Sequence, residues 1–381
     1  MIDPEKKIKV THILTDTGVG GAGKYLLYLT GAGRKDTFEY SVILPQGAAM
    51  ADELRSAGVR VTEVSFPGFR DRSRAPGAKK ELIKLLTTEK PDIVHTHASV
   101  TGMKAAQAAG VKVRFMTRHC ADLPPKYTRH FPGKLFCRGY FRRYVTAAVA
   151  TDESARDALL SCGMPEEKIT VIRNGAEPLR EVSEEEKAAL RRELAIPENT
   201  YVVGCFARLE APKAHEILLR AVSVMKRFAG NVYFIIVGDG SRRTELEELS
   251  RKLHVDDVVR FCGFVRDIAP YMAICTLNVN TSTGTETSNL AISEGLSLGV
   301  VPVVSDFGGN PRSVEGVGVV YSDNDPALLA EEMLKLFRDP EQIKYLSAAG
   351  KKEFFARRTA EKMAEKTETL YLRYLSAAEK Q

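Results

Sequence analysis

Two glutamates eight positions apart flank the beginning of a helix, in a setting suited to polar chemistry. Glu286 lies in a polar loop, residues 281–288, that follows the strand Leu277–Asn280. Glu294 lies within a helix that we expect to open at Asn289. The amide groups of a first helical turn have no partners within the helix, so they can hold a phosphate. Carboxylates instead accept hydroxyl donors in pairs. The stretch therefore predicts a pocket for a diphosphate beside alcohol groups.

Such a pocket has the outline of a nucleotide-sugar site, but the spacing alone supports a plainer alternative equally well. Ser288 or Asn289 can cap the helix. One glutamate would then be the acid that is common near a helix N-terminus, and the other would be solvated. The residues around the two glutamates do not separate these alternatives.

Two permanent cations could compensate the charge of a diphosphate. Arg208 and Lys213 follow the strand Tyr201–Phe206, so we expect them in a loop at its carboxyl end. A charge pair about 4 Å apart contributes about 4 kcal/mol at an effective dielectric of about 20, enough to stabilise a leaving group. In the alternative, both are solvated surface cations. The turn from Gly238 to Gly240 follows an apolar strand and is suited to framing a nucleoside.

A glycine-rich stretch near the N-terminus matches two phosphate-binding patterns in part. Read as a dinucleotide loop, Gly18 to Gly23 requires an acid after the second strand, and residues 44–47 supply none. Read as a P-loop, it requires a serine or threonine where Tyr25 stands. We interpret the stretch as a loop in which Gly20 and Gly21 let the backbone approach a ligand ahead of a helix.

Two short motifs could bind a metal, and we assign neither of them to one. We place His95 and His97 on opposite faces of their strand, and no third ligand is evident. A structural role, or a role lining an acceptor site, is therefore favoured. In the acidic motif 323–325, Asp325 precedes Pro326, which is typical of a helix N-cap followed by proline at the first helical position. No metal or other cofactor is expected.

The chain as a whole has the features of a globular protein of about two domains. It has 381 residues, of which 44% are hydrophobic and 27% are charged. Acids at the N-terminus and the absence of a long apolar run predict neither a signal peptide nor a membrane span. The six cysteines are widely spaced, so we expect neither disulfides nor a zinc site, and a cytoplasmic location.

Positive charge is concentrated in the first half of the chain. Residues 1–178 contain 28 lysines and arginines against 19 acids, whereas the remainder contains 27 against 30. A basic half predicts an anionic partner. We find no nucleic-acid recognition motif, so an anionic membrane surface or a phosphorylated acceptor is favoured, with the protein peripheral at the inner face of a membrane.

One segment in this basic half combines cations with aromatic residues. From Lys134 to Val145 it predicts a helix in which Phe136, Tyr140 and Tyr144 form one stripe, while Lys134, Arg138 and Arg142 lie nearly opposite. This pattern suits a helix on a membrane surface. It also suits an ordinary helix that buries its aromatic residues against its own sheet.

Strand and helix alternate along the chain, which predicts an α/β protein with parallel sheets. We expect two doubly wound, Rossmann-like domains facing each other across a cleft, at residues 1–176 and 177–358, and a last helix at 359–381 that packs across the domains. The expected strands of the first domain are 8–14, 40–44, 59–64, 93–95, 113–117, 147–150 and 169–172, and those of the second are 201–206, 232–237, 258–261, 277–280, 300–304 and 318–321.

Taken together, the motifs resemble those of the retaining glycosyltransferases of family four, which have the GT-B architecture. The resemblance covers nearly the whole chain. It rests on Gly20-Gly21, His119, Asn174-Gly175, Arg208 with Lys213, Gly238-Asp239-Gly240, Gly263-Phe264-Val265, and Glu286 with Glu294, which are spaced as in that family's Glu-x7-Glu motif.

The resemblance implies a role for each matching residue. Arg208 and Lys213 would hold the donor diphosphate, Glu294 would accept ribose hydroxyls, and Glu286 would bind the transferred sugar. His119 would line the reacting face. Backbone groups would contact phosphate, sugar or base at Gly20, Gly21, Gly240, Val265, Asn289 and Leu290.

The implied activity is transfer of a sugar, with retention and without a metal, from a nucleoside-diphosphate donor to an acceptor hydroxyl. We favour a UDP-sugar and a saccharide or lipid-linked acceptor in cell-envelope or polysaccharide synthesis. A hydrolase or epimerase of such donors, or a non-catalytic regulator that binds them, are the alternatives. The family's usual glycine after the lysine is Ala214 here, and its usual late glutamate is Arg312; both departures bear on donor identity.

Overall fold

A computed structural model of the chain describes residues 6–18, 20–65, 76–97, 99–228, 230–284 and 286–380. Val19 in the glycine loop and Thr285 beside Glu286 therefore lie outside the described residues. The described chain forms two compact units. The N-terminal unit comprises residues 1–175 and 360–381, and the C-terminal unit comprises residues 176–359. The predicted domain limits differ from these divisions by one residue.

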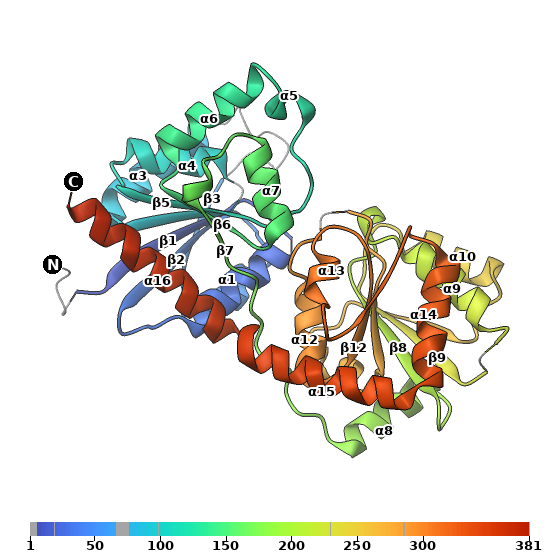
Figure 1. Cartoon of the computed structure of the whole chain (residues 1–381). Coiled ribbons are helices and arrows are strands. Elements are labelled where there is room, and N and C mark those ends of the chain that lie inside the picture. The colour runs from blue at the N-terminus through green and yellow to red at the C-terminus, as the bar shows by residue number, and fades with distance from the viewer. Residues whose placement is uncertain are drawn as a thin grey trace. The chain divides into compact units, whose positions relative to one another are not determined.

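A parallel sheet of seven strands forms the centre of the N-terminal unit (Figure 1). Every neighbouring pair is parallel, as the alternation of strand and helix predicted. The order is β3-β2-β1-β4-β5-β6-β7. The strands are β1 (Ile8–Leu14), β2 (Phe38–Pro45), β3 (Arg60–Val64), β4 (Ile93–His97), β5 (Val113–Arg118), β6 (Ala147–Ala150) and β7 (Ile169–Val171).

The helices of this unit connect successive strands, with one exception at the end of the chain. They are α1 (Gly21–Ala32), α2 (Ala51–Ser56), α3 (Pro76–Glu89), α4 (Val100–Ala108), α5 (Lys126–Arg129), α6 (Gly133–Tyr144) and α7 (Glu153–Ser161). The exception is α16 (Ala360–Glu379), drawn in red in Figure 1, which returns to the N-terminal unit and packs beside α1 and β5.

The C-terminal unit has a second parallel sheet, of six strands in the order β10-β9-β8-β11-β12-β13. Strand β9 has the sequence Val-Tyr-Phe-Ile-Ile-Val and is buried throughout, as expected for a strand covered by helices on both faces. The strands are β8 (Tyr201–Phe206), β9 (Val232–Val237), β10 (Val259–Gly263), β11 (Leu277–Asn280), β12 (Val301–Ser305) and β13 (Val319–Tyr321).

Sequence signals account for several helix ends in this unit. Ser183 and Glu186 form a capping box at the start of α8 (Glu184–Glu193). Near the end of the unit, Asp325 accepts a hydrogen bond from the Ala327 N–H at 2.7 Å, and Pro326 is the first residue of α14. The predicted cap is therefore confirmed. The other helices are α9 (His215–Met225), α10 (Arg243–Lys252), α11 (Ala269–Ala273), α12 (Leu290–Leu298), α13 (Asn310–Ser313), α14 (Pro326–Arg338) and α15 (Pro340–Arg357).

Each sheet has one point at which the chain changes direction across it. In the N-terminal unit this point lies between β1 and β4, and in the C-terminal unit between β8 and β11. Loops at the carboxyl ends of such strand pairs diverge and leave room for a ligand. No helix of the described residues has both the length and the apolar character needed to cross a bilayer.

Candidate functional site

The loops after β8 and β11 meet at the carboxyl edge of the C-terminal sheet. The loop after β8 carries Arg208 and includes a short 3-10 turn, Ala211–Lys213, before α9. The loop after β11 carries Glu286 and leads to α12. Thr281 Oγ1 in the second loop donates to the carbonyl of Lys213 in the first, at 2.8 Å. The structure therefore brings together residues that are about 70 positions apart, at the strand pair where a ligand is expected.

Lys213 and Glu286 form an ion pair between these loops. Their side chains are 19% and 5% exposed, respectively. The two residues were predicted to contact different parts of a ligand, whereas in the structure they bind each other. Glu286 therefore compensates the positive charge of Lys213.

A buried polar network holds Glu286 in place. Ser282 Oγ donates to Glu286 Oε1 at 2.7 Å, and Asn289 Nδ2 donates to Oε2 at 3.1 Å. Behind them, Asn280 Oδ1 accepts from the Ser282 N–H at 2.9 Å and from Asn310 Nδ2 at 3.2 Å. Both carboxylate oxygens are thus occupied by donors from the protein, and the carboxylate has a defined orientation.

Of the residues that hold Glu286 in this network, only Asn289 was predicted from the sequence. A signal was present, because Asn278 and Asn280 alternate with apolar residues in β11 and both are buried. A buried amide requires hydrogen-bond partners. Asn278 Nδ2 donates to the carbonyl of Ala291 in α12 at 2.9 Å, so this asparagine ties the strand to the helix.

Helix α12 begins as the sequence predicted. Asn289 is the N-cap and its side chain accepts from the Ile292 N–H, while Gly299 ends the helix in the left-handed region at φ +82. Asn289 therefore serves both the cap and Glu286. Leu290 is the first helical residue, and Glu294, one turn further along, is buried. The predicted phosphate cradle is thus a well-formed helix N-terminus beside a buried acid.

Arg208 lies exposed on the loop after β8, which crosses closely over the turn after β9. The Leu209 N–H donates to the carbonyl of Asp239 at 3.0 Å. A Cβ added at Gly238 would lie 2.0 Å from the Ala207 carbonyl oxygen, and one at Gly240 would lie 2.5 Å from that of Leu209. Both glycines are needed for the close approach of the two loops, which determines the position of Arg208.

The turn after β10 joins the same edge. Gly263, at φ +72, accepts a hydrogen bond through its carbonyl from the Gly238 N–H at 2.8 Å. Val265 is half-buried and packs on the core cluster beside β9, whereas Phe264 is 65% exposed. The predicted base-contacting segment therefore lies next to the glycine turn that was expected to frame a nucleoside.

The glycine loop of the N-terminal unit lies beside an acid, Asp16, that was not among the predicted site residues. Asp16 Oδ1 accepts from the Gly18 N–H at 3.1 Å, and a Cβ added at Gly20 would lie 3.0 Å from Asp16 Oδ2. Gly20 is the N-cap of α1, and Gly21 has no atom within 4 Å of an added Cβ. A carboxylate beside this helix N-terminus disfavours a phosphate there and favours hydroxyl groups.

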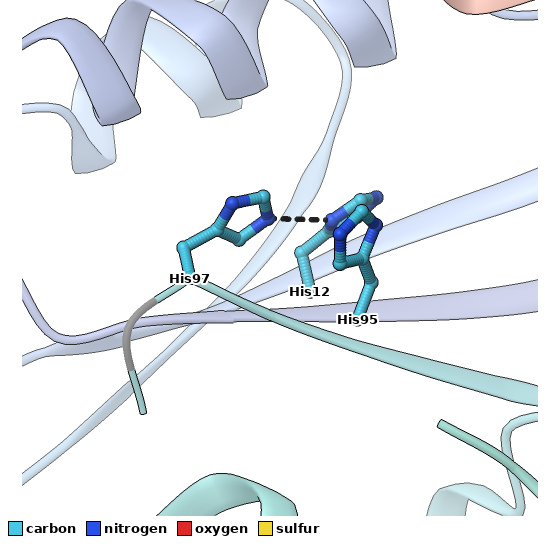
Figure 2. A group of neighbouring side chains, drawn as sticks. All are labelled: His12, His95 and His97. Carbon is cyan, nitrogen blue, oxygen red and sulfur yellow. Dashed lines mark hydrogen bonds between the residues drawn. The ribbon is translucent and has the colours of Figure 1, made fainter. Parts of the chain in front are cut away.

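Four histidines gather at the direction change of the N-terminal sheet. His12 on β1 is paired in register with His95 on β4, and His97 ends the same strand. The prediction that His95 and His97 lie on opposite faces of the strand is wrong, because residues two apart on a strand point to the same face. Figure 2 shows the three side chains together, with a hydrogen bond between His12 and His97. His119, after β5, extends this group.

The histidines form a hydrogen-bonded chain. His12 Nδ1 and His97 Nε2 are 3.1 Å apart, and His97 Nδ1 and His119 Nε2 are 2.9 Å apart. His95 instead bonds Tyr371 of α16 through Nδ1 at 2.5 Å and Thr117 through Nε2 at 2.6 Å. The predicted site residue His119 is therefore the last imidazole of a chain that runs into the core of its unit.

Among the described residues, His12, His95 and His97 each have a ring nitrogen that lies within 4.8 Å of those of the other two. Nitrogens this close together could hold a metal ion. The geometry nevertheless favours hydrogen bonding. The rings of His95 and His97 are stacked, with centroids 4.7 Å apart and planes 25° apart. Both ring nitrogens of His95 have hydrogen-bond partners, in Tyr371 and Thr117, and Nδ1 of His12 is hydrogen-bonded to His97.

Burial keeps this cluster uncharged. It lowers the pKa of His12 from 6.5 to about 3, and it lowers the pKa values of His95 and His97 well below 6.5, with further lowering from neighbouring imidazoles. The pKa of His119 is also lowered to about 3 by loss of solvation. Near neutral pH all four are therefore neutral, able both to donate and to accept hydrogen bonds.

Comparison with known sequences assigns both units. The sequence model described as "Glycosyltransferase Family 4" matches residues 19–180, and the model described as "Glycosyl transferases group 1" matches residues 200–339. Together these two segments cover most of the chain and most of the residues discussed above.

Two relatives and one solved structure illustrate the similarity. LpsE of Rhizobium meliloti, a lipopolysaccharide core biosynthesis glycosyltransferase, is 26% identical over 306 residues, which are 80% of this chain and 81% of LpsE. The alpha-monoglucosyldiacylglycerol synthase of Streptococcus pneumoniae is 24% identical over 271 residues, which are 66% of this chain and 60% of the relative. The crystal structure of HepE from Anabaena in complex with UDP has a TM-score of 0.82 at 21% identity, covering 96% of this chain and 100% of HepE.

The two parallel sheets with alternating helices match the HepE structure, and both halves match sequence models of one enzyme class. The chain therefore belongs to the glycosyltransferases of family four and has the GT-B fold.

Proposed function

We propose that this glycosyltransferase moves a sugar, with retention of anomeric configuration and without a metal, from a UDP-sugar to an acceptor carried by a lipid. The observation that carries the donor half of this proposal is the meeting of the loops after β8 and β11. There, the exposed Arg208, the Lys213–Glu286 pair and the N-terminus of α12 lie at one edge of the sheet.

The ion pair suggests how donor binding prepares the reaction. The diphosphate takes Lys213 from Glu286, because two phosphate groups carry more negative charge than one carboxylate. Glu286, still held by Ser282 and Asn289, then accepts hydroxyls of the transferred sugar. Glu294 accepts the ribose hydroxyls. Arg208 adds the second positive charge, and the amide groups at the start of α12 complete the contacts to the diphosphate.

The transfer step requires no side-chain base. The bond from the anomeric carbon to the diphosphate oxygen breaks, and the acceptor oxygen forms its bond on the same face of the sugar. The acceptor's proton passes to the departing phosphate oxygen. Lys213 and Arg208 stabilise the negative charge that develops on this leaving group, which is the role expected of fixed cations in a transition state.

The N-terminal unit supplies the acceptor side. Asp16 and the amide groups near Gly20 and Gly21 offer acceptors and donors to sugar hydroxyls. His119, kept neutral by burial, lines the reacting face. Relatives named for a glucosyldiacylglycerol and for lipopolysaccharide core synthesis support a lipid-linked acceptor, and HepE structures with UDP and with UDP-glucose support a uridine donor.

The test begins with a donor screen by thermal shift, using UDP-, GDP- and ADP-sugars, because a ligand stabilises the folded state by mass action. We expect UDP-sugars to raise the unfolding midpoint most. With the donor identified, Lys213→Ala should lower kcat by roughly 100-fold or more, as loss of a charge-stabilising contact does. Glu294→Ala should mainly raise the Kd for the donor.

The matched control is Lys226→Ala, which breaks another lysine–carboxylate pair of the same unit, with Asp257, outside the site. Its kinetics should stay normal. Wild-type kinetics in Lys213→Ala would refute the assignment of the donor site.

Free sugar or an isomer formed from the donor without any acceptor would indicate a hydrolase or an epimerase. Full activity after exhaustive chelation is expected, and loss that Mg²⁺ restores would contradict a metal-independent reaction.

A further inference from the structure

Exposed apolar side chains are concentrated around helices α5 and α6. Among the described residues ten large apolar side chains are exposed, and half of them fall between positions 123 and 136. The surfaces of soluble proteins usually carry exposed apolar residues singly, and a cluster of them indicates an interaction site. The five are Leu123 (59% exposed), Tyr127 (75%), Phe131 (86%), Leu135 (61%) and Phe136 (75%).

The fold does not need these five side chains for its own core. Helix α6 buries another face, on which Cys137, Tyr140, Phe141 and Tyr144 pack against the core cluster beside β6 and α7. The predicted aromatic stripe is therefore divided. Tyr140 and Tyr144 pack inward, as in the ordinary alternative, whereas Phe136 remains exposed, as in the membrane alternative.

Positive charge surrounds the exposed apolar residues. No acid occurs between positions 123 and 151, whereas the same stretch holds six cations: Lys126, Arg129, Lys134, Arg138, Arg142 and Arg143. In the described part of the N-terminal unit the ion pairs use other cations, which are Arg34, Arg55, Arg60, Arg156, Arg173 and Lys362. The six cations of this stretch are thus available to an anionic partner.

We propose that the five exposed apolar residues and the six cations form one docking surface for anionic phospholipid, with the apolar side chains inserted at the headgroup level. Such a surface would bring the enzyme to a lipid-borne acceptor, and this link rests on the proposed function. Aromatic side chains favour the membrane interface, and lysine and arginine favour anionic headgroups.

Two features favour a bilayer over other anionic partners. Leu123 and Leu135 offer neither a stacking face nor a hydrogen bond, so they would contribute little to nucleic-acid binding. Apolar side chains that alternate with cations along a short helical segment bind a membrane surface by insertion and charge attraction together. Both contributions must act for stable attachment, which makes the surface sensitive to either kind of substitution.

The experiment is co-sedimentation of the full chain with vesicles of phosphatidylcholine alone and of phosphatidylcholine mixed with phosphatidylglycerol. We expect binding to the mixed vesicles only, and weaker binding at high salt. One double variant, Phe131→Ser with Phe136→Ser, removes apolar contact. A second, Arg138→Gln with Arg142→Gln, removes charge. Each should reduce the bound fraction at least tenfold while the unfolding midpoint stays unchanged.

The matched control is Arg227→Gln with Phe228→Ser, which changes an arginine and an exposed phenylalanine of the C-terminal unit and should bind vesicles as wild type does. Equal binding to both kinds of vesicle, no binding to either, or full binding by both double variants would overturn the proposal. A dimer that the Phe131/Phe136 variant dissociates would assign the face to a second copy of the chain. Because vesicle binding needs neither donor nor turnover, failure here leaves the donor test unaffected.

Discussion

At the residue scale, the proposed donor site depends on how the charge of Lys213 is compensated. Lys213 and Glu286 were predicted to serve the diphosphate and the sugar separately, and the structure pairs them. Their spacing in sequence gave no sign of this, because the pair forms only when the ends of β8 and β11 lie side by side. Removal of one partner leaves the other buried without its counter-charge, so a substitution of either Lys213 or Glu286 should affect stability as well as activity.

The substitution Glu286→Gln separates the competition for Lys213 from the binding of the transferred sugar. The amide keeps the shape that Ser282 and Asn289 contact, but it leaves Lys213 without a counter-charge. We expect UDP itself to bind about as well as before or more tightly, because the carboxylate no longer competes for the lysine, whereas sugar transfer falls roughly 10-fold or more. Calorimetric titration with UDP and a steady-state assay measure the two. A fall in UDP affinity together with unchanged transfer would contradict the exchange of partners.

The close approach of two loops makes Gly240 a specific site for perturbation. In Gly240→Ala the new Cβ would meet the Leu209 carbonyl oxygen at 2.5 Å and its nitrogen at 2.8 Å. The loop that carries Arg208 must shift, so we expect a loss of about 1–3 kcal/mol in unfolding free energy and weaker donor binding. Gly230→Ala, where nothing lies within 4 Å of the added Cβ, is the control. Chemical denaturation of both variants provides the comparison.

The neutral histidines predict a pH dependence of stability. Burial lowers the pKa of His12 to about 3, against 6.5 as a reference, so between these values the unfolded chain binds a proton that the folded chain does not. The contribution of His12 to the free energy of unfolding is therefore fully present above about pH 6.5. It declines as pH falls toward 3, by at most about 1.4 kcal/mol per pH unit. Urea unfolding at a series of pH values should show a steeper acid decline in wild type than in His12→Gln.

At the element scale, α16 is part of the N-terminal unit although it ends the chain. Glu368 on this helix is buried and accepts from Arg34 Nε at 2.6 Å, from the Arg34 N–H at 2.7 Å and from Tyr40 at 2.8 Å. Tyr371 reaches His95. The helical spacing of leucine and tyrosine predicted the helix, but no local pattern indicated which sheet it would cover.

Substitution of Glu368 tests this attachment. Glu368→Gln keeps the side-chain size but removes the charge that Arg34 and Tyr40 contact, so we expect a loss of about 2–4 kcal/mol in unfolding free energy. Glu365→Gln, on the same helix in a surface pair with Lys362, should change stability by less than about 1 kcal/mol. Equal effects of the two substitutions would show that Glu368 is not the anchor of α16.

At the scale of the whole molecule, the two units have separate cores, each on its own sheet. The residues proposed to bind the donor, Arg208, Lys213, Glu286 and Glu294, all belong to the C-terminal unit. Scanning calorimetry should therefore resolve two transitions, and UDP at about 100 times its Kd should stabilise one of them by about 2.7 kcal/mol. A single transition, or an equal shift of both, would show that the units unfold together.

The sequence by itself determined the class of fold, the position of most strands, the caps of α12 and α14, and the motifs that identify the enzyme family. These features depend on local chemistry: apolar runs, the side chain that caps a helix, and glycine where φ is positive. Only the tertiary structure decided the pairing of Lys213 with Glu286, the network from Asn280 to Asn310, the stacking of His95 on His97 and the exposure of Phe136. Each of these joins or separates residues according to which strands and helices are neighbours, and that information is absent from the order of residues within any one segment.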